Sequence, residues 1–193
     1  MANITATDIM PMEQYGAERR ERARALSAIK RDRRVEVGPH ATFYFENYDT
    51  MWHQIHEMLY IEKGGEDQIA GELAAYNPLI PQGRELVATF MIEISDPERR
   101  ARILAGLGGI EETITLTVGG ETITVIAEDD IDRTTAEGKA SAIHFLHFPF
   151  TDAQVAAFSR PGAEIVLSIA HPGYRHMAII PETVRAALAS DFD

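Results

Sequence analysis

Alternating apolar and polar residues predict a set of short β-strands. The clearest is the hairpin TITLTVGGETITVI at 113–126, where a two-glycine turn pairs Leu116 with Ile123 and Ile114 with Val125 on an apolar face. Threonines then occupy the opposite, polar face. Comparable runs predict further strands at 35–46, 86–94, 142–149 and 164–170. We therefore expect a single α+β domain with a mostly antiparallel sheet and helices packed on one side.

Helical periodicity predicts a long N-terminal helix over residues 8–33, with Asp8 as its cap and Pro11 in its first turn. Its apolar stripe is thin, so this helix is expected to lie across a surface or to form an appendage. A second helix follows the corner at 47–50, with Asp49 or Thr50 as its cap, and ends at a Gly-Gly pair. Further helices are expected at 66–76, 97–104, 151–159 and 182–189.

Composition narrows the class of protein. The chain has 193 residues and no cysteine, which excludes disulfides, thiolate chemistry and iron–sulfur ligation by its own side chains. No apolar run approaches the roughly 20 residues of a membrane span, and the N-terminus lacks a signal-peptide pattern, so a cytoplasmic location is expected. The net charge of −12 argues against a general binder of polyanions.

This charge is distributed unevenly along the chain. Residues 19–34 carry eight basic side chains against Glu21 and Asp32, which gives the segment a charge of +6 and the remainder −18. The segment can dock on the acidic body of its own chain, contact a partner, or bind nucleic acid. The nucleic-acid prediction is the weakest of these, because the segment has no interleaved aromatic residues.

Histidines and carboxylates supply the candidate chemistry. His53, His56 and Glu57 are spaced i, i+3 and i+4 on the second helix, close enough to share a metal. Their order, H-x-x-H-E, matches no catalytic zinc motif, and half-exposed surface side chains are the alternative. His144 and His147 alternate to opposite faces of a strand, so one of them is expected beside the core, bonded to a backbone carbonyl.

Other positions leave two interpretations open. Glu46 follows an aromatic strand and is expected to be partly buried, either as an acid, base or ligand, or as a group that satisfies backbone donors at the corner. His171 and His176 flank a Pro-Gly turn, where they serve the turn or line a pocket with Tyr174. The acidic run at 128–132 lacks the spacing of a calcium loop and is expected to be solvated. The sequence contains no nucleotide-binding or serine-hydrolase motif.

Seven short motifs run through the whole chain: RRVEVG at 33–38, FEN at 45–47, Thr50, QIHEM at 54–58, YNPLIP at 76–81, SAIHF at 141–145 and HPGY at 171–174. Together they resemble an uncharacterised bacterial family of domains of unknown function of about this length. The resemblance implies a gene encoded beside rubrerythrin-like di-iron proteins and iron–sulfur oxidoreductases. It therefore implies, by association, a role in a redox or oxidative-stress system.

The resemblance marks as candidate functional residues Glu46, Asn47, Thr50, Gln54, Glu57, His144, His171 and Tyr174. Glu46, Glu57, His144 and His171 would suit iron, manganese or zinc if the fold brings them together. The leading hypothesis is an accessory or partner-binding protein of the redox system, with the basic helix as its contact surface. The alternatives are a metal-dependent enzyme that uses these four side chains and a nucleic-acid binder that uses residues 19–34.

Overall fold

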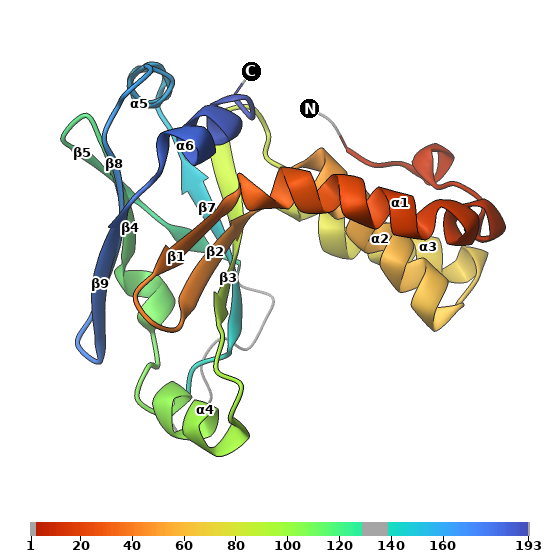
Figure 1. The fold of residues 1–193 in the computed structure, drawn as a ribbon, viewed down its shortest axis with the longest axis horizontal. Coiled ribbons are helices and arrows are strands. Elements are labelled where there is room, and N and C mark those ends of the chain that lie inside the picture. Colours follow the sequence, from red (N-terminus) through yellow and green to blue (C-terminus); the bar gives the residue numbers. More distant parts are fainter. Residues whose placement is uncertain (1–2, 129–138, 193) are drawn as a thin grey trace.

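The computed structural model describes residues 3–128 and 139–192, which form an α+β fold (Figure 1). Its α-helices are α1 (Met12–Arg31), α2 (Tyr48–Glu62), α3 (Glu66–Tyr76), α4 (Pro97–Leu104), α5 (Asp152–Phe158) and α6 (Glu182–Ala189). Its strands are β1 (Arg34–Val37), β2 (Ala41–Phe45), β3 (Glu85–Ile92), β4 (Ile114–Val118), β5 (Glu121–Thr124), β6 (Ile126–Ala127), β7 (Ile143–Pro149), β8 (Ile165–His171) and β9 (Tyr174–Ile179).

The strands form two antiparallel sheets instead of one. The first sheet has the order β1-β2-β3-β7-β6, and the second has the order β5-β4-β8-β9. The predicted antiparallel character is confirmed, but local patterns do not encode which distant strands pair, so the division into two sheets was not predicted. Strand β9 was also not predicted, because only Tyr174 among its residues is buried and no apolar alternation marks it.

The glycine-turn hairpin has most of the predicted register. Leu116 faces Ile123, as expected, whereas Ile114 faces Ile169 of β8 instead of Val125. The reason is that β5 ends at Thr124, one residue before the predicted partner. The hairpin therefore contributes its apolar face to the second sheet and also supplies that sheet with one of its edges.

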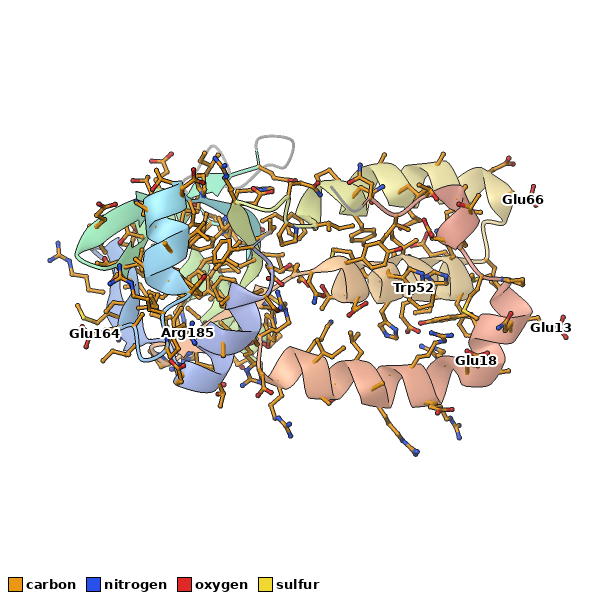
Figure 2. The ribbon with its side chains drawn as sticks, turned by 90° about the horizontal axis from the view of Figure 1, so that it is seen from above. Glu13, Glu18, Trp52, Glu66, Glu164 and Arg185 are labelled. Carbon is orange, nitrogen blue, oxygen red and sulfur yellow. The ribbon has the colours of Figure 1, made fainter. Side chains whose placement is uncertain are left out.

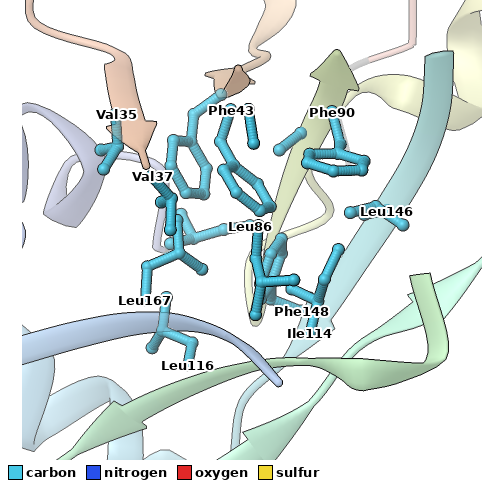
Figure 3. Packing of buried hydrophobic residues seen from close by; sticks show 14 of the residues in the cluster. Val35, Val37, Phe43, Leu86, Phe90, Ile114, Leu116, Leu146, Phe148 and Leu167 are labelled. Atoms are coloured by element: carbon cyan, nitrogen blue, oxygen red, sulfur yellow. The ribbon is translucent and has the colours of Figure 1, made fainter. Parts of the chain in front are cut away.

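The main hydrophobic core lies between the two sheets (Figure 3). Alternate side chains of β1, β2, β3 and β7 point inward and meet those of β4 and β8. The labelled members of this cluster are Val35, Val37, Phe43, Leu86, Phe90, Ile114, Leu116, Leu146, Phe148 and Leu167. Burial of each such side chain stabilises the fold by about 1.5–3 kcal/mol, so this inter-sheet layer dominates stability.

Helices α1, α2 and α3 form a helical arm that extends from one side of the sheets (Figure 1). Helix α2 lies between α1 and α3 (Figure 2). A second apolar cluster joins α2 and α3 to Val87, on the outer face of β3. In keeping with its thin apolar stripe, α1 buries only Tyr15 and Leu26.

Helix boundaries differ from the sequence prediction at two places. Helix α1 begins after Pro11, because Asp8 belongs to a separate 3-10 turn and accepts hydrogen bonds from Thr5. Helix α2 is capped by Asn47 and not by Asp49 or Thr50. The Asn47 side chain accepts the N–H of Thr50 at 3.0 Å, and the Thr50 hydroxyl accepts the N–H of Asn47 at 2.9 Å. The predicted bounds of α3 and α4 are confirmed.

Two further sequence predictions concern the acidic run at 128–132 and the absence of a membrane span. Of the acidic run 128–132, only Glu128 belongs to the described residues. Within the described part of the chain, no helix is long and apolar enough to cross a membrane.

Candidate functional site

The helical arm is fastened by a buried tyrosine and an ion pair. Tyr15 of α1 is fully buried, and its Oη donates a 2.6 Å hydrogen bond to Oε1 of Glu57 on α2. Arg19 donates two more bonds to the same carboxylate, at 2.8 Å and 2.7 Å. The bonds from Arg19 hold the pKa of Glu57 at about 2, and burial next to this carboxylate raises the pKa of Tyr15. Glu57 is therefore ionised, with both oxygens engaged.

His53 and His56 lie beside this pair. Nδ1 of His56 donates to the carbonyl of Trp52 at 2.7 Å, and Nε2 accepts the N–H of Met10 at 3.1 Å. The His56 ring also stacks on Trp52, with centroids 3.6 Å apart, inside the helical arm (Figure 2). His53 Nδ1 lies 3.2 Å from Tyr15 Oη and donates to it, since the tyrosine proton is used in the bond to the carboxylate. Burial lowers the pKa of both histidines.

These contacts favour a structural role over a shared metal at His53, His56 and Glu57. Both ring nitrogens of His56 are bonded to backbone groups, and the Glu57 carboxylate is neutralised by Arg19. A metal would have to displace these partners before it could bind. The cluster instead holds α1 against α2 and fixes the position of the basic helix.

The residues at the strand–helix corner support the same helix. Glu46 is buried, as expected, and its Oε1 accepts a 2.7 Å hydrogen bond from the Thr89 hydroxyl, not from backbone donors. Asn47 and Thr50 form the reciprocal cap of α2. Gln54 donates to the hydroxyl of Tyr76 at 3.4 Å, which links α2 to α3.

His144 lies in the core between the sheets, as predicted for one of the two strand histidines. Its Nε2 donates to the carbonyl of Ser141 at 3.0 Å, and its ring packs against Phe90. Nδ1 lies 3.7 Å from a carboxylate oxygen of Glu111, which is also buried. This imidazole–carboxylate pair is enclosed by the core, so a substrate has no direct access to it.

Tyr174 anchors the start of β9 to the turn between β1 and β2. Its hydroxyl accepts the N–H groups of His40 at 2.9 Å and Ala41 at 3.0 Å, and donates to the carbonyl of Val37 at 2.8 Å. His171 serves the neighbouring turn, where its Nδ1 accepts the N–H of Gly173 at 3.1 Å. Both residues thus have defined structural contacts at the sheet ends.

The structure does not bring the four proposed metal ligands together. Glu46, Glu57, His144 and His171 each have different partners, in the corner, the helical arm, the core and a turn. Within residues 3–128 and 139–192, no group of three or more histidine, aspartate or glutamate side chains is arranged to hold a metal ion. The metal-enzyme hypothesis therefore gains no support from their placement.

His147 points to the opposite face of the same strand, as predicted, and is held by two carboxylates. Nδ1 meets Glu85 at 3.1 Å and Nε2 meets Glu128 at 3.1 Å. The hydrogen bond to Glu85, reinforced by Glu128, raises the pKa of His147 despite its burial. Because each nitrogen faces a different carboxylate, the arrangement suits a bound proton better than a metal.

A basic groove of about 750 Å³ opens where the end of α1 faces β1 and β9. We call this feature the basic groove. It is lined by Arg24, Ser27, Ala28, Lys30, Arg31, Arg34, Val35, Glu36, Tyr44, Ala178, Ile179 and Pro181. Four of these side chains are basic and one is acidic. The local charge thus opposes the net charge of −12 of the chain.

The basic residues of α1 and β1 divide into two groups. Arg19 pairs with Glu57 and Arg22 with Glu18, and Arg33 is buried in an ion pair with Asp191. Arg31 contacts Asp32, and Arg34 contacts Glu36 of β1. The remaining three, Arg20, Arg24 and Lys30, are exposed and form no ion pair with any residue of the described chain. Docking on the chain's own acidic groups therefore accounts for only part of the segment.

Some contributors to these sites were not found from the sequence. The Tyr15 hydroxyl meets a carboxylate 42 residues away, and nothing in the local sequence indicates this contact. The β9 side of the groove was missed together with that strand. The basic segment itself was identified from the sequence, because eight basic residues against two acidic ones stand out in a chain of net charge −12.

The fold and these sites define an α+β protein of two antiparallel sheets, with a helical arm and a basic groove, and no group of side chains among the described residues is arranged to hold a metal ion. The chain belongs to the family described as Protein of unknown function (DUF3501), whose model matches residues 3–192. This confirms the predicted family of uncharacterised proteins.

Solved structures include a relative over the full chain. A crystal structure of a novel protein of unknown function from Burkholderia pseudomallei K96243 is 39% identical, with a TM-score of 0.92 and coverage of 100% of both chains. A comparison with curated proteins found no match. The relatives thus support the fold and the family, and the function has to be argued from the site.

Proposed function

We propose that this protein is an accessory, partner-binding protein whose contact surface is the basic groove with the adjoining exposed face of α1. The observation that carries the proposal is the presence of three exposed cations, Arg20, Arg24 and Lys30, without an ion-pair partner in the described chain. Unpaired surface charge of one sign attracts a partner of the opposite sign and orients it during association.

The helical arm supports this role because it gives the contact surface a fixed position. Arg19 and Tyr15 both bind Glu57, so one face of α1 is held against α2. Arg20 and Arg24 are exposed, and Arg24 and Arg31 border the groove. A partner would therefore meet a preorganised array of charges, which lowers the ordering cost of binding.

The partners we propose are redox proteins of the rubrerythrin-like or iron–sulfur type in a bacterial cytoplasm. The support for this choice is the sequence resemblance alone, and the groove adds that the docking surface of the partner should be acidic. Such a contact between exposed charges weakens as the salt concentration rises.

Nucleic acid is the alternative ligand for a basic surface, and several features argue against it. Among the described residues that line the basic groove, Tyr44 is the one aromatic residue, and the guanidinium carbon of Arg34 lies over its ring, 5.9 Å from the centroid. Arg19 and Arg33 are turned toward carboxylates and so are not offered to phosphates. The overall charge of −12 adds repulsion.

Native co-purification tests the proposal, with the double variant Arg24→Glu/Arg31→Glu and the matched control Arg102→Glu on α4. Arg102 is exposed and lies outside the groove. We expect an acidic redox protein to be recovered with the wild-type chain and the control, and to be lost with the double variant. Equal recovery with the double variant, or no recovered partner at all, would overturn the proposal. Retention of the wild-type chain on heparin at moderate salt would instead favour nucleic acid.

A further inference from the structure

The basic groove is bordered by two strand edges that pair with no further strand among residues 3–128 and 139–192. Strand β1 is the first strand of one sheet, and β9 is the last strand of the other. Both strands contribute lining residues: Arg34, Val35 and Glu36 from β1, and Ala178 and Ile179 from β9. The groove therefore lies where the edges of the two sheets come together, with α1 along one side.

The hydrogen-bond register shows which backbone groups of β9 face this gap. The N–H of Ile180 donates to the carbonyl of Ile165 at 2.9 Å. Alternate residues of an antiparallel pair are bonded to the neighbouring strand, so Ala178 and His176 also bond to β8. The N–H and C=O groups of Met177 and Ile179 consequently point away from β8, toward the open edge.

Strand β1 presents its own free groups by the same rule. The N–H of Phe45 donates to the carbonyl of Arg33 at 2.8 Å, so Val35 bonds to β2. The backbone groups of Arg34 and Glu36 then face outward from the sheet. Along both strands, backbone donors and acceptors that pair with no described strand thus border one groove.

The side chains around the groove favour a ligand that is both apolar and acidic. Met177 and Ile179 are 74% and 64% exposed, which is unusual for large apolar residues and gives β9 an apolar outer face. Arg24 and Arg31 of α1 supply the positive charge on the other side. An extended peptide fits this pattern if it has acidic and apolar side chains in alternation, because successive side chains of a strand point in opposite directions.

We propose that an extended acidic segment of the partner docks in the basic groove and adds to the edge of β9 as a further antiparallel or parallel strand. This inference rests on the proposed function and specifies the part of the partner that is recognised. Backbone hydrogen bonds to Met177 and Ile179 supply affinity, and the arginines of α1 select acidic side chains. The partner strand would cover the exposed edge that the free protein leaves open.

A fluorescein-labelled peptide of about eight residues with alternating glutamate and valine tests this inference by fluorescence anisotropy. The test variant is Met177→Pro, which removes an N–H that does not bond to β8. Thr122→Pro is the matched control, because Thr122 lies on β5, the opposite edge of the same sheet, at a position that does not bond to β4. Both are edge prolines, so they perturb folding to a similar extent.

We expect the wild-type chain and Thr122→Pro to bind the peptide, and Met177→Pro to bind it about tenfold more weakly. The reason is that proline at position 177 removes one backbone hydrogen bond to the peptide and pushes the peptide strand away from the edge of β9. A peptide with lysine in place of glutamate should not bind. Equal affinities for the two proline variants would overturn strand addition, and so would the absence of binding to the acidic peptide at about 1 mM.

Hydrogen exchange keeps the inference testable if Met177→Pro does not fold. Saturating peptide should slow exchange of the Met177 and Ile179 amides in the wild-type chain, and unchanged exchange there would overturn the inference. The two proposals fail in different ways. Loss of partner recovery with Arg24→Glu/Arg31→Glu but not with Met177→Pro would leave the contact surface standing and reject the added strand.

Discussion

Replacement of Tyr174 by phenylalanine tests how strongly β9 is anchored to the first sheet. The substitution keeps the ring of a residue that is only 7% exposed, and removes only the hydroxyl. That hydroxyl accepts two backbone N–H groups, from His40 and Ala41, and donates to one carbonyl, of Val37. Tyr174→Phe therefore leaves three backbone groups without this partner at a single turn.

The expected loss follows from these three bonds. One intramolecular hydrogen bond contributes about 0.5–1.5 kcal/mol net, and a buried group left unsatisfied costs more. We therefore expect Tyr174→Phe to lower the free energy of unfolding by about 2–4 kcal/mol. For a chain of this size, 3 kcal/mol corresponds to a fall in Tm of roughly 6–12 °C.

Urea denaturation followed by circular dichroism measures this change, with Tyr44→Phe as the control. The Tyr44 hydroxyl also makes hydrogen bonds, to Glu93, but in an exposed position. Its loss should cost less than about 0.5 kcal/mol. If the two substitutions cost the same, or if Tyr174→Phe costs less than about 0.5 kcal/mol, the tyrosine is not the anchor that we describe.

Two further substitutions probe local features. Gly38 has φ +73°, and an added Cβ would lie 2.5 Å from the His176 ring, so Gly38→Ala should destabilise the protein by about 2 kcal/mol or more in urea denaturation. Gly65→Ala, at φ +71° in open space, should cost about half as much, and equal losses would contradict the close contact. His147→Gln should remove about 1–2 kcal/mol at low pH. Because the pKa of His147 is raised in the folded state, its contribution is complete below the ordinary value of about 6.5 and is lost as pH rises through the raised pKa. Unfolding curves of both proteins between pH 5 and 9 should therefore converge at high pH, and a constant difference would reject the charged pairing.

Local signals were sufficient to predict most elements of the fold. The Gly-Gly hairpin, the helix at 66–76 and the Asp96–Pro97 helix start were predicted because each depends on neighbouring residues alone. The second sheet was not predictable in this way, since the pairing of β4 with β8 joins residues about 50 positions apart. Strand β9 was not predicted, because an exposed edge strand lacks the alternation of buried and exposed residues that marks other strands.

The candidate site shows the same limit. Burial of Glu46 and of one strand histidine followed from their position after or within apolar strands, and both are confirmed. Their partners, Thr89 and Ser141, became visible only in three dimensions. The sequence could not show whether the four potential metal ligands lie close together, because they belong to separate parts of the chain and the direction of each side chain depends on the tertiary fold. Charge density was more informative, since Arg20, Arg24 and Lys30 of α1 form no ion pair with any residue that the structure describes.

The long-range anchors also bear on how the chain is synthesised. Tyr174 bonds to Val37 across 137 residues, and Asp191 pairs with Arg33 across 158. Translation delivers the N-terminal strands first, whereas β8 and β9 arrive almost last. Until β8 and β9 have been made, β4 and β5 are the strands of the second sheet that can cover the inner apolar face of the first sheet. We expect the nascent protein to depend on chaperones that shield apolar surface until its final segment emerges.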